Sequence, residues 1–170
     1  VVTATDVAGN SSTDSSIDDL EIDTTAPDAP AALDLDAASD SGTADDDNLT
    51  NDTTPTIHGT AEAGSTVKLL HGAIELGETT ADGSGNWTID SSELADGVQQ
   101  LTATATDAAG NLSAVSTALQ VNIDTTAPDA PAALDLDAAS DSETADDDVT
   151  TDTTPTINGT AEAVSTVTLL

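Results

Sequence analysis

The sequence has almost no positive charge and almost no aromatic side chains. Its 170 residues include a single Lys or Arg against 33 Asp and Glu, so the formal net charge is −32. Nucleic acid and anionic membrane surfaces are bound through Lys and Arg, so this composition excludes both as partners. The absence of cysteine excludes disulfide bonds.

The sequence also lacks long apolar segments. No apolar run approaches the roughly 18 residues of a membrane span, which excludes membrane insertion of this segment. No signal-peptide pattern opens the sequence, so we expect any secretion signal to lie outside it. Leu, Ile and Val make up only about a fifth of the residues, and with such a high net charge this composition would favour disorder. Internal repetition and strand patterning outweigh that expectation.

The sequence is a tandem repeat with a period of about 100 residues. Residues 22–41 recur without change at 123–142, an offset of 101 positions. Residues 52–70 recur with few changes at 152–170, an offset of 100. A repeat of this length has the size of a domain and exceeds that of a solenoid repeat.

The phase of the repeat divides the chain into three parts. Residues 1–23 are the C-terminal part of one repeat, residues 24–123 are a complete repeat, and residues 124–170 are the N-terminal part of a third. We call residues 24–123 the complete unit. We expect the first part to supply the last two strands of its repeat and the third part to supply the first three.

Apolar and polar residues alternate along the complete unit with the two-residue period of β-strands. Turns rich in Gly, Asn and Asp separate the alternating runs. Seven short strands in about 100 residues predict an all-β fold, an immunoglobulin-like β-sandwich. We expect Trp87 in its core, although an exposed Trp could stack on a sugar. The runs lie at residues 31–38, 54–61, 65–70, 74–76, 87–89, 98–107 and 115–123.

The acidic residues gather in loops and linkers. If the strands alternate in direction, the turns at Glu62 and Asp107 fall at one end of the sandwich, beside Asp23 of the preceding linker. The acidic loop at residues 40–52 then falls at the other end, beside Asp124. Calcium takes about six to eight oxygen ligands, largely carboxylates and carbonyls. We therefore predict calcium (Ca2+) at the junctions, held by Asp23, Glu62 and Asp107 at the first and by Asp45, Asp47, Asp124 and Glu162 at the second.

Other interpretations of these acids stay open. Acidic loops keep a secreted or halophilic protein soluble without binding any ion. Asp107 and Asn111 have the spacing of an Asx turn in a hairpin. The loop at residues 40–52 could also hold ions of its own.

The motifs DTTAPDAP, TPTIHGTAEAGSTV, ADGSGNWT and TATATDAAGN resemble the bacterial immunoglobulin-like repeats of giant secreted adhesins of the RTX and biofilm-associated group. The resemblance covers the complete unit and both partial ones. It implies an extracellular tandem of β-sandwiches with calcium at the linkers, used as an extender between a cell-surface anchor and an adhesive tip. The ligands it carries over are Asp23, Glu62 and Asp107, with their copies Asp6, Asp124 and Glu162.

We therefore expect a non-catalytic structural extender of a bacterial surface adhesin or extracellular filament. Its partners would be the neighbouring repeats of the same chain and, in a filament, other copies. A glycan- or protein-binding module and an accessory module of a secreted enzyme stay open as alternatives. The near-identity of the repeats favours the extender, because a spacer needs length and sameness rather than a unique pocket.

Overall fold

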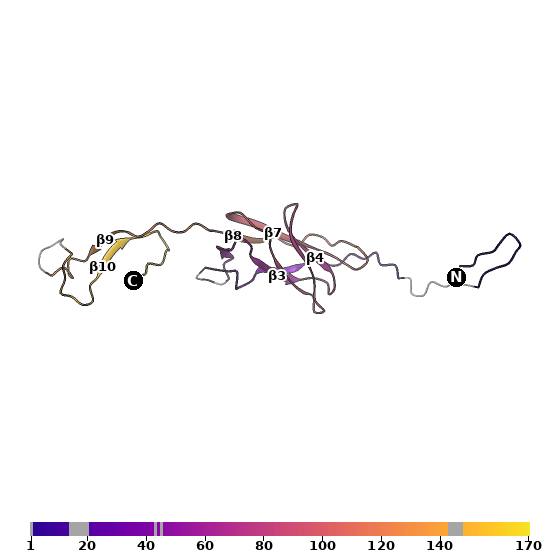
Figure 1. The fold of residues 1–170 in the computed structure, drawn as a ribbon, viewed down its shortest axis with the longest axis horizontal. Coiled ribbons are helices and arrows are strands. Elements are labelled where there is room, and N and C mark those ends of the chain that lie inside the picture. The colour runs from indigo at the N-terminus through magenta and orange to yellow at the C-terminus, as the bar shows by residue number, and fades with distance from the viewer. Residues whose placement is uncertain (1, 14–20, 43, 45, 143–147) are drawn as a thin grey trace. The chain divides into compact units, whose positions relative to one another are not determined.

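The computed structural model describes residues 2–13, 21–42, 44, 46–142 and 148–170. The chain divides into two compact parts, Val1–Thr125 and Thr126–Leu170. Within the described residues, every regular element is a β-strand (Figure 1). No helix that could cross a membrane is found among these residues.

The complete unit folds into two sheets that form a β-sandwich. One sheet has the strand order β1 (Ala31–Leu35), β3 (Thr56–Thr60), β6 (Asn86–Asp90). The second has the order β2 (Leu49–Thr50), β8 (Leu119–Ile123), β7 (Gly97–Thr106), β4 (Thr66–His71), β5 (Ile74–Thr80). Only the β2–β8 pair is parallel among the described strand pairs. The predicted all-β sandwich is confirmed.

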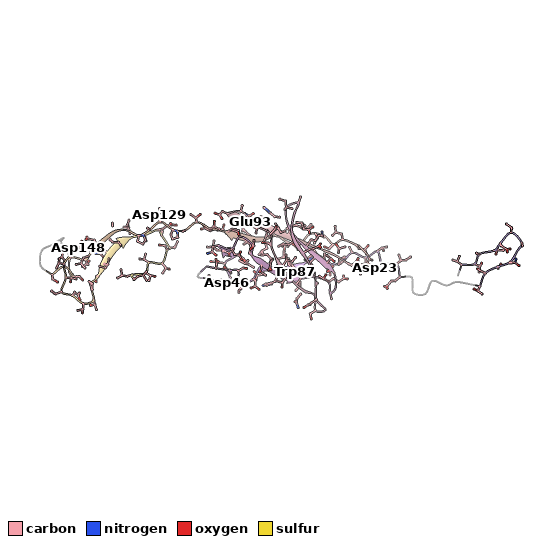
Figure 2. All side chains as sticks on the ribbon, in the orientation of Figure 1. Asp23, Asp46, Trp87, Glu93, Asp129 and Asp148 are labelled. Atoms are coloured by element: carbon pink, nitrogen blue, oxygen red, sulfur yellow. The ribbon has the colours of Figure 1, made fainter. Side chains whose placement is uncertain are left out.

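The core lies between the two sheets and is lined by alternate residues of each strand. Ile57 of β3, Leu69 of β4 and Leu101 of β7 are fully buried. Trp87 of β6 is 3% exposed, and Figure 2 shows it among the side chains of the sandwich. This burial confirms the core position expected for Trp87 and leaves no aromatic face for stacking on a sugar.

Three details of the second sheet differ from the sequence prediction. Strand β5 extends to Thr80, beyond the predicted run at residues 74–76. Strand β2 was not predicted, because two residues are too short to show an alternating pattern. They pair with the C-terminal end of β8, which is far away in the sequence. The last strand begins at residue 119 rather than 115. Ahead of it, the hydroxyls of Ser113 and Ser116 accept hydrogen bonds from the backbone N–H groups of Ala105 and Ala103. The N–H groups of Ser113 and Ser116 in turn donate to the carbonyls of Ala105 and Ala103, so each serine pairs with β7 through its main chain and its side chain.

The third part of the chain forms two of its three expected strands. β9 (Ala132–Leu136) and β10 (Ile157–Thr160) pair antiparallel, as β1 and β3 do in the complete unit. The third strand, expected at residues 165–170, is not formed. It corresponds to β4, which pairs with β5 and β7 in the complete unit. The residues that would correspond to β5 and β7 in this repeat are not among the 170 residues.

The first part of the chain forms a hairpin within residues 2–13. An antiparallel bridge between Thr5 and Ser11 closes it. An equivalent bridge joins Thr106 and Leu112 in the complete unit, so the repeated sequence produces the same local structure twice. The remainder of the strand pair expected in residues 1–23 includes residues 14–20, which lie outside the described residues.

The close contact between Trp87 and Gly59, its register partner in β3, gives a test of the core. A Cβ atom at position 59 would lie 2.5 Å from Trp87 Cζ2 and 3.0 Å from the Ala31 carbonyl oxygen. We predict that Gly59→Ala lowers the free energy of unfolding by about 1–3 kcal/mol, the usual range for overpacking. Denaturant unfolding followed by Trp87 fluorescence measures this change.

Gly83→Ala is the matched control, because no atom lies within 4 Å of a Cβ at that position. Equal unfolding midpoints for the two variants would contradict the packing described for Trp87.

Candidate functional site

Three turns share the sequence pattern Asp-x-x-Gly-Asn and the same hydrogen bonds. At Asp107, Oδ1 accepts from the N–H groups of Ala109 (2.9 Å) and Asn111 (2.8 Å), and Oδ2 accepts from Asn111 Nδ2 (2.8 Å). Gly110 has a φ of +92°, a conformation that favours glycine. The Asn111 side chain is the main cause that lowers the pKa of Asp107 below its usual range. The other two turns begin at Asp6 and Asp82.

The Asp107 turn contacts the linker that precedes the complete unit. Asn111 Nδ2 also donates to the backbone carbonyl oxygen of Asp23, at 3.2 Å. The Asp23 carboxylate accepts from the Thr25 N–H group at 2.9 Å. The expected Asx turn of Asp107 and Asn111 is confirmed, and this turn lies beside Asp23, where the strand order had predicted it. Each carboxylate oxygen has two lone pairs, so the turn leaves Asp107 able to accept a further ligand.

Glu62 lies beside a later residue of the same linker. It lines a groove of about 320 Å³ together with Asp28. Its copy Glu162 lines a similar groove with Asp129, and Glu162 Oε2 accepts from the Asp129 N–H group at 3.4 Å. Sequence reasoning assigned Asp23 and Asp124 to these glutamates. It counted Asp28 among the acidic linker residues but assigned no ligand role to Asp28 or Asp129, although both copies of the linker carry this second Asp.

The acidic loop after β1 is fastened to the end of the last strand. The Asn122 N–H donates to the Asn48 carbonyl and the Asp124 N–H donates to the Thr50 carbonyl, both at 2.8 Å. The loop and Asp124 therefore lie together, as the strand order predicted. Figure 2 shows Asp46 of this loop and Asp23 toward opposite ends of the sandwich. Asp47 is exposed, and Asp45 lies outside the described residues.

The donor chemistry of these groups suits a hard cation, because all the candidate ligands are oxygen atoms. Among the described residues, no three His, Cys, Asp or Glu side chains lie close enough together to hold a metal ion. Asp23, Glu62 and Asp107 therefore do not form a preassembled carboxylate cluster. Backbone carbonyls and water would have to complete any cation site built on them.

The carboxylates at the linkers and in the loop have no cationic side chain to neutralise them. Lys68 is the only Lys or Arg in the sequence. Its Nζ lies 2.6 Å from Glu75 Oε2 and 3.4 Å from Glu78 Oε2, both on β5. The hydrogen bond with Glu75 is the main cause that raises the pKa of Lys68. The negative charge of the remaining carboxylates must therefore be compensated by backbone N–H groups, water and dissolved cations.

Comparison with known families identifies the fold of the complete unit. The model of the bacterial Ig-like domain matches residues 26–125, more than half of the chain. The chain therefore belongs to the bacterial Ig-like domain family, a membership compatible with an extracellular adhesin-like module. A search of curated proteins finds no match.

The Asp107 turn should make a pH-dependent contribution to stability. The folded-state pKa of Asp107 lies below the unfolded-state value, so its stabilisation is present above the unfolded-state pKa and is lost as the pH falls through the folded-state pKa. We predict a favourable coupling between Asp107→Ala and Asn111→Ala at about pH 7 that shrinks at about pH 2. A double-mutant cycle of denaturant unfolding, followed by Trp87 fluorescence, measures it. A coupling of the same size at both pH values would contradict the assignment.

Proposed function

We propose that this chain is a segment of a structural extender in a bacterial surface adhesin or extracellular filament. The near-identical tandem repetition of a bacterial Ig-like unit carries the proposal. Each repeat adds length, and neighbouring repeats of the same chain are the partners of every unit. In a filament, other copies of the chain would join them. The segment has no catalytic role in this proposal.

The way in which the linkers attach to the complete unit supports this function. Asn111 holds the carbonyl of Asp23 on the N-terminal side. On the C-terminal side, the Thr125 hydroxyl lies 2.8 and 2.9 Å from the two carboxylate oxygens of Asp96. Each linker is thus hydrogen-bonded to the sandwich at the point where it meets it.

Calcium is the ion that would stiffen the junctions. It would be held by Asp23, Glu62 and Asp107, or their copies, together with the acidic loop of the preceding repeat. Extracellular modules bind calcium with dissociation constants of about 10⁻⁴–10⁻³ M. Calcium at millimolar concentration outside a cell would occupy such sites, whereas micromolar calcium inside would not. The extender would therefore be secreted flexible and become rigid outside.

The alternative of a glycan-binding module has no comparable support. Sugar recognition commonly uses an exposed aromatic face, and the single aromatic side chain of the sequence, Trp87, is buried in the core. No feature of the described residues points to an accessory module of an enzyme.

Small-angle scattering tests the proposal on a chain that contains several consecutive complete repeats. We predict an extended rod in millimolar calcium and a more compact, flexible ensemble in chelator. Replacing Asp124 and Glu162 by Ala should remove the difference at that junction, because both carboxylates are assigned to the junction ion.

The control variant carries Asp34→Ala and Asp135→Ala, which remove the same charge from within strands β1 and β9. It should respond to calcium as the parent chain does. If the scattering curves with calcium and with chelator superimpose, the junction carboxylates are solvated charges that bind no calcium. The calcium mechanism would then be wrong.

A further inference from the structure

Part of strand β8 has a neighbouring strand on one side only. On its inner side, β7 pairs with every residue of β8, from Leu119 to Ile123. On its outer side, β2 pairs with Asn122 and Ile123 alone. Among the strands that the structure describes, none lies beside the outer side of residues 119–121. These residues therefore form an open edge of the five-stranded sheet.

The main-chain groups of Gln120 face this open edge. In an antiparallel pair, successive residues of a strand direct their N–H and C=O groups to opposite sides. The Asn122 N–H group donates to the Asn48 carbonyl on the outer side, at 2.8 Å. Gln120, two residues earlier in the same strand, therefore directs its own N–H and C=O groups to that side as well. Unpaired groups on a sheet edge are a template for pairing with a further strand.

A groove of about 380 Å³ lies along the same edge. Its lining includes residues 117–120, Leu33 of β1 and Val98 of β7. Val98 is 55% exposed, and Leu33 and Leu119 are only partly buried, so the groove can cover an apolar side chain. Main-chain groups at an open edge with a side-chain pocket beside them are the two requirements of recognition by β-strand addition.

The charge of the protein determines which kind of segment this groove favours. Asp47 is exposed and lines the groove, and no Lys or Arg lines it. The formal net charge of the chain is −32, so an acidic segment would be repelled and a basic one attracted. A second copy of this chain brings only one Lys or Arg, Lys68, which is paired with Glu75 and Glu78. Charge complementarity therefore favours a basic segment of another protein.

We propose that the open edge of β8 binds an extended, basic peptide segment of another protein by β-strand addition. The segment pairs with the main chain of Gln120, packs an apolar side chain against Leu33 and Val98, and directs a Lys or Arg toward Asp47. This binding goes beyond the extender role, and it requires neither calcium nor the junction residues Asp124 and Glu162. An array in which every complete repeat carries such an edge would bind a repetitive basic partner with avidity.

The test measures binding of labelled synthetic peptides to the full 170-residue chain by fluorescence anisotropy. The peptides have about eight residues, enough for one strand, and alternate Lys with Val, Lys with Pro or Glu with Val. Measurement at about 0.15 M NaCl limits attraction between distant charges. The Lys-Val peptide should bind. The Lys-Pro peptide carries the same charge but lacks half of the N–H donors, and it should bind about tenfold more weakly or less. The Glu-Val peptide should not bind.

Three variants locate the site. Gln120→Pro removes the N–H group that faces the open edge, where proline is tolerated, and should weaken Lys-Val binding by about 3- to 10-fold. Asp47→Asn should weaken it by about two- to fivefold. Glu93→Gln removes the same charge from an exposed position that does not line the groove, and it should bind as the parent chain does. If Gln120→Pro fails to fold, backbone amide NMR of the parent chain replaces it, and the Lys-Val peptide should shift the signals of residues 117–120.

Three results would overturn the inference. Equal binding of the Lys-Val and Lys-Pro peptides would mean that only general attraction to an acidic surface is measured. Unchanged affinity in Gln120→Pro or, if that variant does not fold, amide shifts confined to other strands would exclude the β8 edge. Self-association of the parent chain, with amide shifts at residues 117–120 in the absence of peptide, would assign the edge to a second copy. None of these results bears on the calcium-dependent stiffness of the proposed function.

Discussion

An excess of carboxylates with no matching cations is the constraint on which this structure depends. The fold meets it by directing aspartate side chains at its own backbone. Asp23, Asp36 and Asp52 each accept a hydrogen bond from the N–H group two residues later, and the Asp-x-x-Gly-Asn turns add two more donors to one carboxylate. The acidic residues of the chain therefore also form its turns. In the Asp-x-x-Gly-Asn turns, hydrogen bonding to the charged form lowers the pKa values of Asp6, Asp82 and Asp107.

A second adaptation is visible in the sparse core. The core contains few large apolar side chains, and glycine residues lie opposite two of them. Trp87 lies against Gly59, and Ile89 lies so close to Gly77 that a Cβ there would be 2.6 Å from its Cγ2 atom. Close approach of backbone and side chain increases the packing of each large residue. Gly59 and Gly77 are therefore part of the core packing.

Sequence patterns predicted the strands that alternate and failed where structure depends on distant partners. Ile57 and Leu101 face the core because their neighbours are polar, which is a local property. Strand β2 exists only because Asn122 and Asp124 donate to carbonyls of the loop.

The candidate site was predictable to a similar degree. The strand order correctly placed the Asp107 turn near Asp23 and the acidic loop near Asp124. It could not indicate that Glu62 and Glu162 lie beside the second Asp of each linker, because this depends on the path of the linker over the sheet. The ligand roles of all these carboxylates remain predictions.

The parallel pairing of β2 with β8 has a mechanical consequence. Tension on a tandem array would reach the complete unit through the chain before β1 and leave it through the residue that follows β8. Two parallel strands pulled from opposite ends slide past each other, so the hydrogen bonds that join them are loaded together and not one after another. The hydrogen bonds from Asn122 and Asp124 to the loop would thus resist this sliding next to the linker that follows β8. Single-molecule stretching would measure it as an unfolding force that falls when this pairing is disrupted.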